Sequence, residues 1–88
     1  MENLDKLIEE KAKEYGKPID YFSSLAEMWG AMLCTTLSTN QVVAMYVAAK
    51  SLRGFNNPDH YDSFLDIAGY GKIGCDLIET IESNDYNL

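Results

Sequence analysis

Residues 61–82 read YDSFLDIAGYGKIGCDLIETIE, and this stretch decides which class of fold the chain adopts. Within it, GYGKIG at 69–74 has the G-x-G-x-x-G spacing that holds a dinucleotide pyrophosphate at the start of a helix. Such a site requires a β-strand directly before the first glycine, but SFLDIA shows no alternation of apolar and polar residues. Its apolar residues instead continue at helical spacing into those that follow. The stretch therefore predicts one long helix and not a dinucleotide-binding turn.

Glycines inside a helix need a physical reason, because each costs about 1 kcal/mol relative to alanine. Gly71 falls on the apolar stripe of the predicted helix, where a missing side chain would let another helix backbone, or Trp29, pack against the main chain. Gly69 and Gly74 could equally mark a kink. We expect close packing at Gly71, and a local distortion that opens a ligand pocket is the functional alternative.

Apolar residues recur at helical spacing along the rest of the chain, so we expect an all-α fold. The predicted helices cover approximately residues 3–15, 20–33, 39–53 and 58–82. No repeat, low-complexity tract or linker divides the sequence, which predicts a single helical domain over residues 1–88 and a small four-helix, bundle-like arrangement. A four-helix chain this short has little core of its own, which favours a homo-oligomer. The six tyrosines and several methionines could supply its surface.

Capping residues and helix breakers set these helix limits. Gly16 is expected to end the first helix and Asp20 to cap the second. The third helix has the clearest start, since Ser38 and Gln41 fit a capping box in which each side chain accepts from the other residue's backbone N–H. Gly54 is expected to end this helix, and the following FNNP to supply a cap and a first-turn proline for the fourth.

The net charge of −7 limits the classes of partner. From residue 18 onward, nine acids outnumber the basic residues Lys50, Arg53 and Lys72. Such a surface repels phosphate backbones, so we expect no direct binding of DNA or RNA. No apolar run is long enough to span a membrane, and the charged stretch MENLDKLIEEK does not resemble a signal peptide. We therefore expect a cytoplasmic protein in which Cys34 and Cys75 are reduced core thiols rather than a disulfide.

Two pairs of charged residues flank the connection between the third and fourth predicted helices. Lys50 and Arg53 are spaced i,i+3, and Asp62 and Asp66 are spaced i,i+4, so each pair projects from about one helical face. The simplest use is a salt-bridge network that locks the two helices together. Two alternatives remain open, a phosphate or nucleotide site at the basic pair and a metal site at the two carboxylates.

Aromatic residues offer a second kind of candidate site. Trp29 lies on an apolar stripe, which favours a core position, but it could also floor a pocket on which a base stacks beside Tyr70 or Tyr46. His60 has no Ser or Cys nucleophile placed beside it by a recognisable motif, so nucleophilic catalysis is not expected. We expect His60 to be a surface or capping side chain.

Four motifs occur in order along the chain: Lys-x-Tyr-Gly at 13–16, Ala-x-x-Trp at 26–29, Lys-x-x-Arg at 50–53 and Asp-x-x-x-Asp-x-x-Gly-Tyr at 62–70. Together they resemble an uncharacterised family of short all-helical phage and prophage proteins, the domain of unknown function 6378. The resemblance covers roughly residues 13–79 and implies a phage source and an all-α fold, but no reaction.

This sequence departs from the pattern of that family at two positions. The family often has an acid where Gln41 stands, and the change weakens a metal site that would use a carboxylate from the third helix. It often has Ala where Gly71 stands, which suggests tighter packing here than is usual. The last motif is also weakly similar to the final helix of MazG-like all-α nucleotide pyrophosphatases. Those enzymes hold Mg²⁺ with Glu-x-x-Glu and Glu-x-x-Asp pairs, whereas the second predicted helix here offers only Glu27.

These observations favour a non-enzymatic phage accessory protein that acts against a host defence by binding, in the cytoplasm of the infected bacterium. Its expected ligand is a nucleotide-type molecule. The residues expected to bind it are Trp29, Lys50, Arg53, Asp62, Asp66 and Tyr70. One alternative is an acidic inhibitor of a basic host protein, such as a nuclease or defence component. Another is a divergent MazG-like pyrophosphatase, the only alternative that would need a cofactor, Mg²⁺.

Overall fold

A computed structural model describes the backbone of residues 3–86 and the side chains of residues 3–14 and 16–80. The helices are α1 (Leu4–Tyr15), α2 (Pro18–Leu33), α3 (Thr39–Asn56) and α4 (Tyr61–Tyr86). Residues 3–86 contain no strand, so the prediction of a small all-α bundle is confirmed. None of these described helices is long and apolar enough to cross a membrane.

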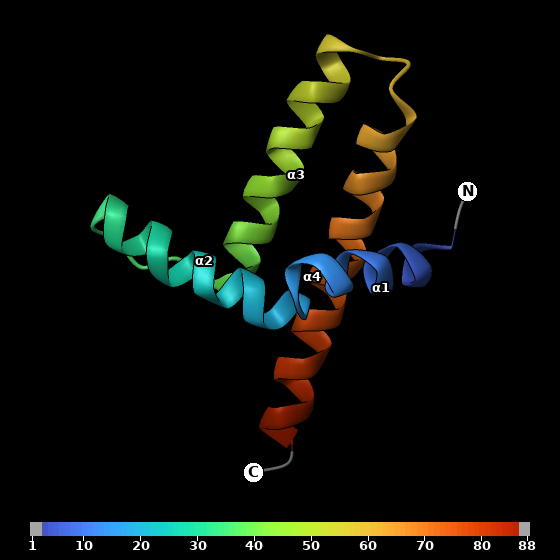
Figure 1. The fold of residues 1–88 in the computed structure, drawn as a ribbon. Coiled ribbons are helices and arrows are strands. Elements are labelled where there is room, and N and C mark those ends of the chain that lie inside the picture. Colours follow the sequence, from blue (N-terminus) through green and yellow to red (C-terminus); the bar gives the residue numbers. More distant parts are fainter. Residues whose placement is uncertain (1–2, 87–88) are drawn as a thin grey trace.

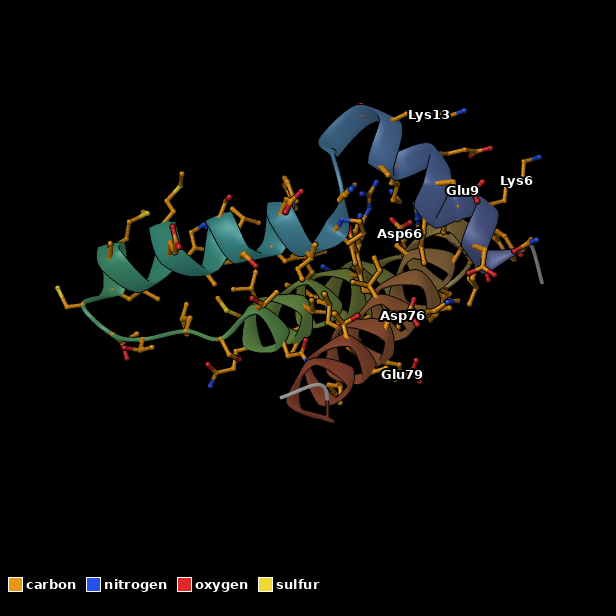
Figure 2. The ribbon with its side chains drawn as sticks, turned by 90° about the horizontal axis from the view of Figure 1, so that it is seen from below. Lys6, Glu9, Lys13, Asp66, Asp76 and Glu79 are labelled. Carbon is orange, nitrogen blue, oxygen red and sulfur yellow. The ribbon has the colours of Figure 1, made fainter. Side chains whose placement is uncertain are left out.

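The helices form two layers. In Figure 1, α3 and α4 run antiparallel, side by side, and α1 and α2 cross them. Figure 2 shows that α1 and α2 lie on the same side of this pair. The main contacts join α3 to α4 and α2 to α3, with smaller ones from α1 to α4 and to α2. The buried core lies where α2 crosses the α3–α4 pair. Its residues are Phe22, Ala26, Val42, Val43, Ile73 and Leu77.

The start of α3 agrees with the prediction from the sequence, whereas its end does not. Ser38 Oγ accepts from the Gln41 N–H at 3.1 Å, and Gln41 Oε1 accepts from the Ser38 N–H at 2.8 Å, so the predicted capping box is confirmed. The prediction that Gly54 ends α3 is wrong, since the helix runs on to Asn56. Gly54 is buried, and a Cβ built on it would lie 3.1 Å from the Phe64 ring of α4. This glycine therefore allows the two helices to approach each other.

The predicted starts of α4 and α2 are also corrected. Helix α4 begins at Tyr61 and not at Pro58, which lies in the preceding turn. His60 Nδ1 lies 2.7 Å from Ser63 Oγ, and the Ser63 N–H donates to the His60 carbonyl at 3.2 Å. His60 thus directly precedes α4, and its ring contacts a hydroxyl group rather than capping a backbone N–H. Helix α2 has Lys17 as its N-cap, without a side-chain bond, so the prediction of Asp20 as the cap is wrong.

The reason for the second correction is local. The fixed φ of Pro18 suits the first helical position, so α2 begins two residues before Asp20. Asp20 instead lies inside the first turn, where a carboxylate interacts favourably with the helix dipole. Gly16 does end α1, with a φ of 85° that favours glycine, and its N–H donates to the Ala12 carbonyl at 2.9 Å.

The prediction of close packing at Gly71 is wrong. Gly71 is exposed, and no neighbouring atom lies within 4 Å of a Cβ built on it. The close approaches occur two residues earlier and three residues later on α4. A Cβ on Gly69 would lie 3.3 Å from Leu7 of α1, and one on Gly74 would lie 3.7 Å from Val43 of α3. The tighter packing inferred from the family's alanine at position 71 is therefore also absent.

The prediction that both cysteines lie in the core is wrong as well. Cys34 and Cys75 are free thiols, and both are exposed. Cys34 ends α2 in the left-handed conformation, with a φ of 54°, and its backbone N–H bonds back to carbonyls of the last turn. Its side chain is consequently outside the helix interface. Cys75 falls on the solvent side of α4, between Gly74, which faces α3, and Asp76, which pairs with a lysine.

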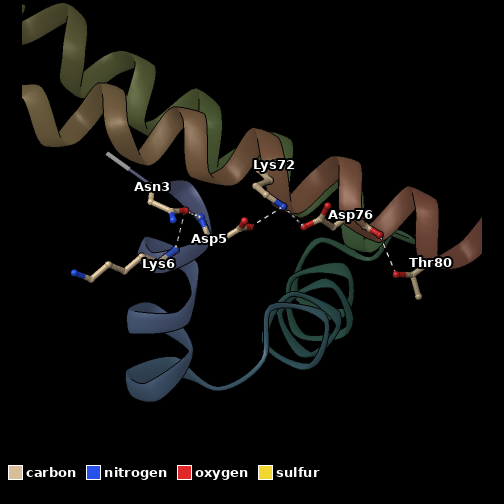
Figure 3. A network of polar contacts seen from close by, with 6 residues as sticks. All are labelled: Asn3, Asp5, Lys6, Lys72, Asp76 and Thr80. Carbon is tan, nitrogen blue, oxygen red and sulfur yellow. Dashed lines mark hydrogen bonds and ion pairs between the residues drawn. The ribbon is translucent and has the colours of Figure 1, made fainter. Parts of the chain in front are cut away.

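The start of α1 is fastened to α4 by one lysine. Lys72 Nζ lies 2.9 Å from an oxygen of Asp76 on its own helix and 3.1 Å from an oxygen of Asp5 on α1. Asn3 caps α1, because its side-chain oxygen accepts from the Asp5 N–H at 2.9 Å (Figure 3). The hydrogen bond to Asp76, and then that to Asp5, raise the pKa of Lys72 above its ordinary value of 10.5.

We predict that Asp76→Asn lowers the pKa of Lys72 towards 10.5, because it removes the largest cause of the shift. Asp5→Asn should lower the pKa of Lys72 as well. Since the folded-state pKa is the higher one, the pairing stabilises the fold fully below pH 10.5 and is lost as the pH rises through the folded-state pKa. The measurement is an NMR titration of the Lys72 side chain. A titration curve that neither substitution moves would contradict the prediction.

We predict opposite effects of alanine at two helical glycines. A Cβ on buried Gly30 would lie 2.7 Å from the Thr35 carbonyl oxygen, a backbone atom that cannot turn aside. Gly30→Ala should therefore lower the free energy of unfolding by about 1–3 kcal/mol. Gly71→Ala, the matched control in open space, should raise it by about 0.5–1 kcal/mol. Urea denaturation followed by circular dichroism measures the free energy of unfolding of both variants. Equal changes at the two positions would contradict the predicted difference in packing.

Candidate functional site

A cavity of about 250 Å³ lies where α1 and the start of α2 meet α3 and α4. Its polar lining consists mainly of three tyrosines, Tyr21, Tyr46 and Tyr70, and two lysines, Lys11 and Lys50. The rest of the wall is largely apolar. These side chains come from all four helices, so the cavity exists only in the assembled fold.

The tyrosines form one aromatic wall. The rings of Tyr46 and Tyr70 are stacked, with centroids 5.3 Å apart and planes 14° from parallel. Tyr21 continues the series at 6.4 Å from Tyr46, and the two hydroxyl oxygens lie 3.0 Å apart, within hydrogen-bond distance. Phe22 meets Tyr46 edge to face at 5.2 Å, an arrangement that stabilises aromatic pairs beyond their burial. The wall is therefore held both by ring contacts and by a hydroxyl pair.

The carboxylate of Asp66 pairs with both lysines of the cavity. One oxygen of Asp66 lies 3.1 Å from Lys50 Nζ, and the other lies 3.6 Å from Lys11 Nζ. The Asp66 side chain is only 14% exposed, and it lies between α1 and the α3–α4 pair (Figure 2). Two ammonium groups against one carboxylate leave this cluster with a net charge of +1. The cavity thus has a locally positive end in a chain whose net charge is −7.

The six ligand-binding residues proposed from the sequence do not all lie at the cavity. Lys50 and Tyr70 line the cavity, and Asp66 pairs with Lys50, so part of the predicted network between α3 and α4 is present. Trp29 packs on Tyr46, with centroids 5.8 Å apart, and lies outside the cavity lining. Both Arg53 and Asp62 are exposed. Among the described side chains, those of residues 3–14 and 16–80, neither of these two residues takes part in an ion pair.

No metal site is formed by the carboxylates that the sequence suggested. Asp66 is occupied by two lysines, and Asp62 points to solvent one turn earlier on α4. Across the described side chains there is no group of three or more His, Cys, Asp or Glu residues that could hold a metal ion. The arrangement therefore offers cations and aromatic rings to a ligand, and not a cluster of carboxylates.

A family model described as "Domain of unknown function (DUF6378)" matches residues 1–78. The chain belongs to this family. The resemblance seen in the spaced motifs is thereby confirmed, although the family's description gives no activity. No curated protein and no solved structure matches the chain. The main feature of this DUF6378 domain that bears on its function is therefore the cavity between its four helices.

Two cavity residues of the DUF6378 domain were missed by sequence reasoning. Lys11 lies three residues after Ile8, at the border of the apolar stripe of α1, and this position was the available signal. A lysine there can lay its aliphatic stem along the cavity wall while its ammonium group reaches Asp66. Tyr21 adjoins the core residue Phe22, and nothing in the spacing of α2 distinguishes it from a surface tyrosine.

We predict that Asp66→Asn lowers the free energy of unfolding of this DUF6378 domain by about 1–3 kcal/mol, because it leaves two lysines without their shared carboxylate. Asp62→Asn is the matched control, the same change one turn earlier on α4. It should cost at most about 0.5 kcal/mol, since Asp62 is exposed. Thermal and urea denaturation would measure both variants. Equal losses would show that the bridge contributes nothing of its own.

Proposed function

We propose that this chain is a non-enzymatic binding protein for a small nucleotide-type ligand, held in the tyrosine-lined cavity. The observation that carries the proposal is that Lys11 and Lys50 share one cavity with the stacked pair of Tyr46 and Tyr70. Nucleotides combine an aromatic base with an anionic phosphate. A cavity with an aromatic wall and a positive end is complementary to both parts.

Each part of such a ligand has a defined counterpart. Phosphate oxygens would accept from the ammonium groups of Lys11 and Lys50, which are charge-assisted hydrogen bonds of the stronger kind. Because Asp66 pairs with both ammonium groups, it would keep them close together, in position to bind one anion. The base would pack on the tyrosines, as bases do on aromatic side chains of nucleic-acid-binding proteins, where each such contact contributes about 1–3 kcal/mol.

The size of the cavity limits the ligand. Its volume of about 250 Å³ lies just below the range of about 300–1,000 Å³ typical of small-molecule sites. The ligand is accordingly a mononucleotide, or one nucleotide unit of a larger signal such as a cyclic oligonucleotide. The proposed role is that of a phage accessory protein that sequesters a host-defence signal in the cytoplasm of the infected bacterium. The reason for this role is the resemblance of the sequence motifs to phage proteins.

The two other functions receive less support from the geometry. An acidic inhibitor needs a continuous negative surface, but on the outer side of α1 the acid Glu9 is flanked by Lys6 and Lys13 (Figure 2). A pyrophosphatase of the MazG kind needs paired carboxylates, and the carboxylate next to this cavity, Asp66, already faces two lysines. The cavity therefore favours binding of an anion.

We predict that isothermal titration calorimetry detects binding of at least one member of a panel of nucleoside monophosphates and cyclic oligonucleotides. Lys50→Gln should weaken this binding by about tenfold or more, because it removes one charge-assisted hydrogen bond at the cavity. Arg53→Gln is the matched control on the same helix. Arg53 is exposed and outside the cavity lining, so the affinity should stay within about twofold of the wild type.

Three outcomes would reject the proposal. The first is that no ligand of the panel releases or absorbs heat at protein concentrations on the order of 100 μM, where millimolar affinities begin to be detectable. The second is that Lys50→Gln binds as tightly as the wild type. The third is that Arg53→Gln weakens binding as much as Lys50→Gln, which would place the site on the outer surface of α3 and not in the cavity.

A further inference from the structure

Helix α3 is apolar on two opposite faces, and only one of them is covered. Val42, Val43 and Gly54 are buried on the side facing α2 and α4. The opposite side carries Met45, Ala48, Leu52 and Phe55, spaced by three, four and three residues. We refer to these four residues as the outer stripe. Met45 is 40% exposed, Leu52 62% and Phe55 84%. An apolar stripe of a helix normally packs against another element, and among the described residues none buries the outer stripe.

The outer stripe also lacks the charge found elsewhere on this chain. No acid occurs between Glu27 and Asp59, although the chain as a whole carries a net charge of −7. The basic residues of this segment are Lys50, which faces the cavity, and Arg53. Acids on α1 and α4 would repel a second copy of so acidic a chain. The outer face of α3 lies within this acid-free segment, so such repulsion is weak there.

The exposed area of the chain exceeds that of a compact monomer of the same mass. The chain exposes 6294 Å² for a mass of 9.9 kDa. A compact monomer of this mass exposes roughly 5,200 Å². The difference of roughly 1,100 Å² is similar to the area of about 800 Å² that each partner contributes to a standard protein interface. The radius of gyration of 14.1 Å likewise exceeds the value of about 12 Å for a compact domain of this length.

We infer that the outer stripe is covered by a second copy of this chain, with the two α3 helices antiparallel about a two-fold axis near residue 50. In this arrangement the numbers of two residues that face each other across the axis add up to about 100. Ala48 then faces Leu52 of the partner, small against large, and Met45 faces Phe55 of the partner at each end. The stripe is thus complementary to itself, which a two-fold interface requires.

The proposed interface leaves the ligand cavity accessible. Tyr46 and Lys50 lie on the side of α3 that faces the cavity, away from the outer stripe. A two-fold pair would therefore carry two open cavities. The pairing does not depend on the proposed function, and each can fail without the other.

The mass in solution tests the pairing. Sedimentation equilibrium of the full chain should give twice the chain mass of 9.9 kDa. Leu52→Glu should raise the dissociation constant of the dimer by about tenfold or more, since it places a carboxylate at the centre of the contact. Phe55→Glu should act in the same direction. Met32→Glu is the matched control, since Met32 is an apolar residue of α2 whose exposure of 73% lies between those of Leu52 and Phe55. It should leave the dimer intact. Circular dichroism of each variant checks that the helices are retained.

Cysteine cross-linking tests the antiparallel register. In a chain with Cys34→Ser and Cys75→Ser, the variants Ala48→Cys and Leu52→Cys are prepared separately, mixed and oxidised. The mixture should give more disulfide-linked dimer than either variant alone, because position 48 faces position 52 of the partner. A monomer at concentrations on the order of 100 μM, where stable dimers remain associated, would overturn the inference. So would a dimer broken by Met32→Glu but not by Leu52→Glu, an assembly larger than two chains, or equal cross-linking in all three samples.

Discussion

The close contact between α3 and α4 is the constraint on which the rest of this structure depends. Gly54 makes room for Phe64 near one end of the pair, and Gly74 lies against Val43 near the other. Between these points the two helices present a common surface to α2 and α1. The core residues of α2 and the lysine bridge of α1 both attach to that surface, so the cavity requires the assembled pair.

The sequence predicted those features that depend on neighbours along the chain. The capping box at the start of α3 follows from Ser38 and Gln41 alone, because both hydrogen bonds close within one turn. The fold class followed from helical spacing in the same way. The predicted end of α3 was wrong because a glycine near a helix end can either terminate the helix or allow close approach of another helix. Only the position of Phe64 shows that Gly54 serves the second.

The candidate site was predicted only in part for a related reason. Lys50 and Asp66 were identified because they flank a short connection, but the same argument also selected Arg53 and Asp62, which the fold leaves exposed. Spacing along a helix gives a face, and it does not say which neighbouring helix that face meets. Lys11 lies 39 residues before Lys50 and 55 residues before Asp66 along the chain. No local pattern reports a contact of that kind.

The two ion pairs of α1 have a consequence for energetics. Helix α1 supplies one wall of the cavity, and its polar attachments to α4 run through Lys72 at its start and through Lys11 in its second half. Any molecule that occupies the cavity and contacts Lys11 is in contact with the docked helix. By thermodynamic linkage, occupancy and docking of α1 then favour each other to the same extent. Helix α1 makes the smallest apolar contribution to the core. The stability of its packing should therefore depend on whether the cavity is occupied.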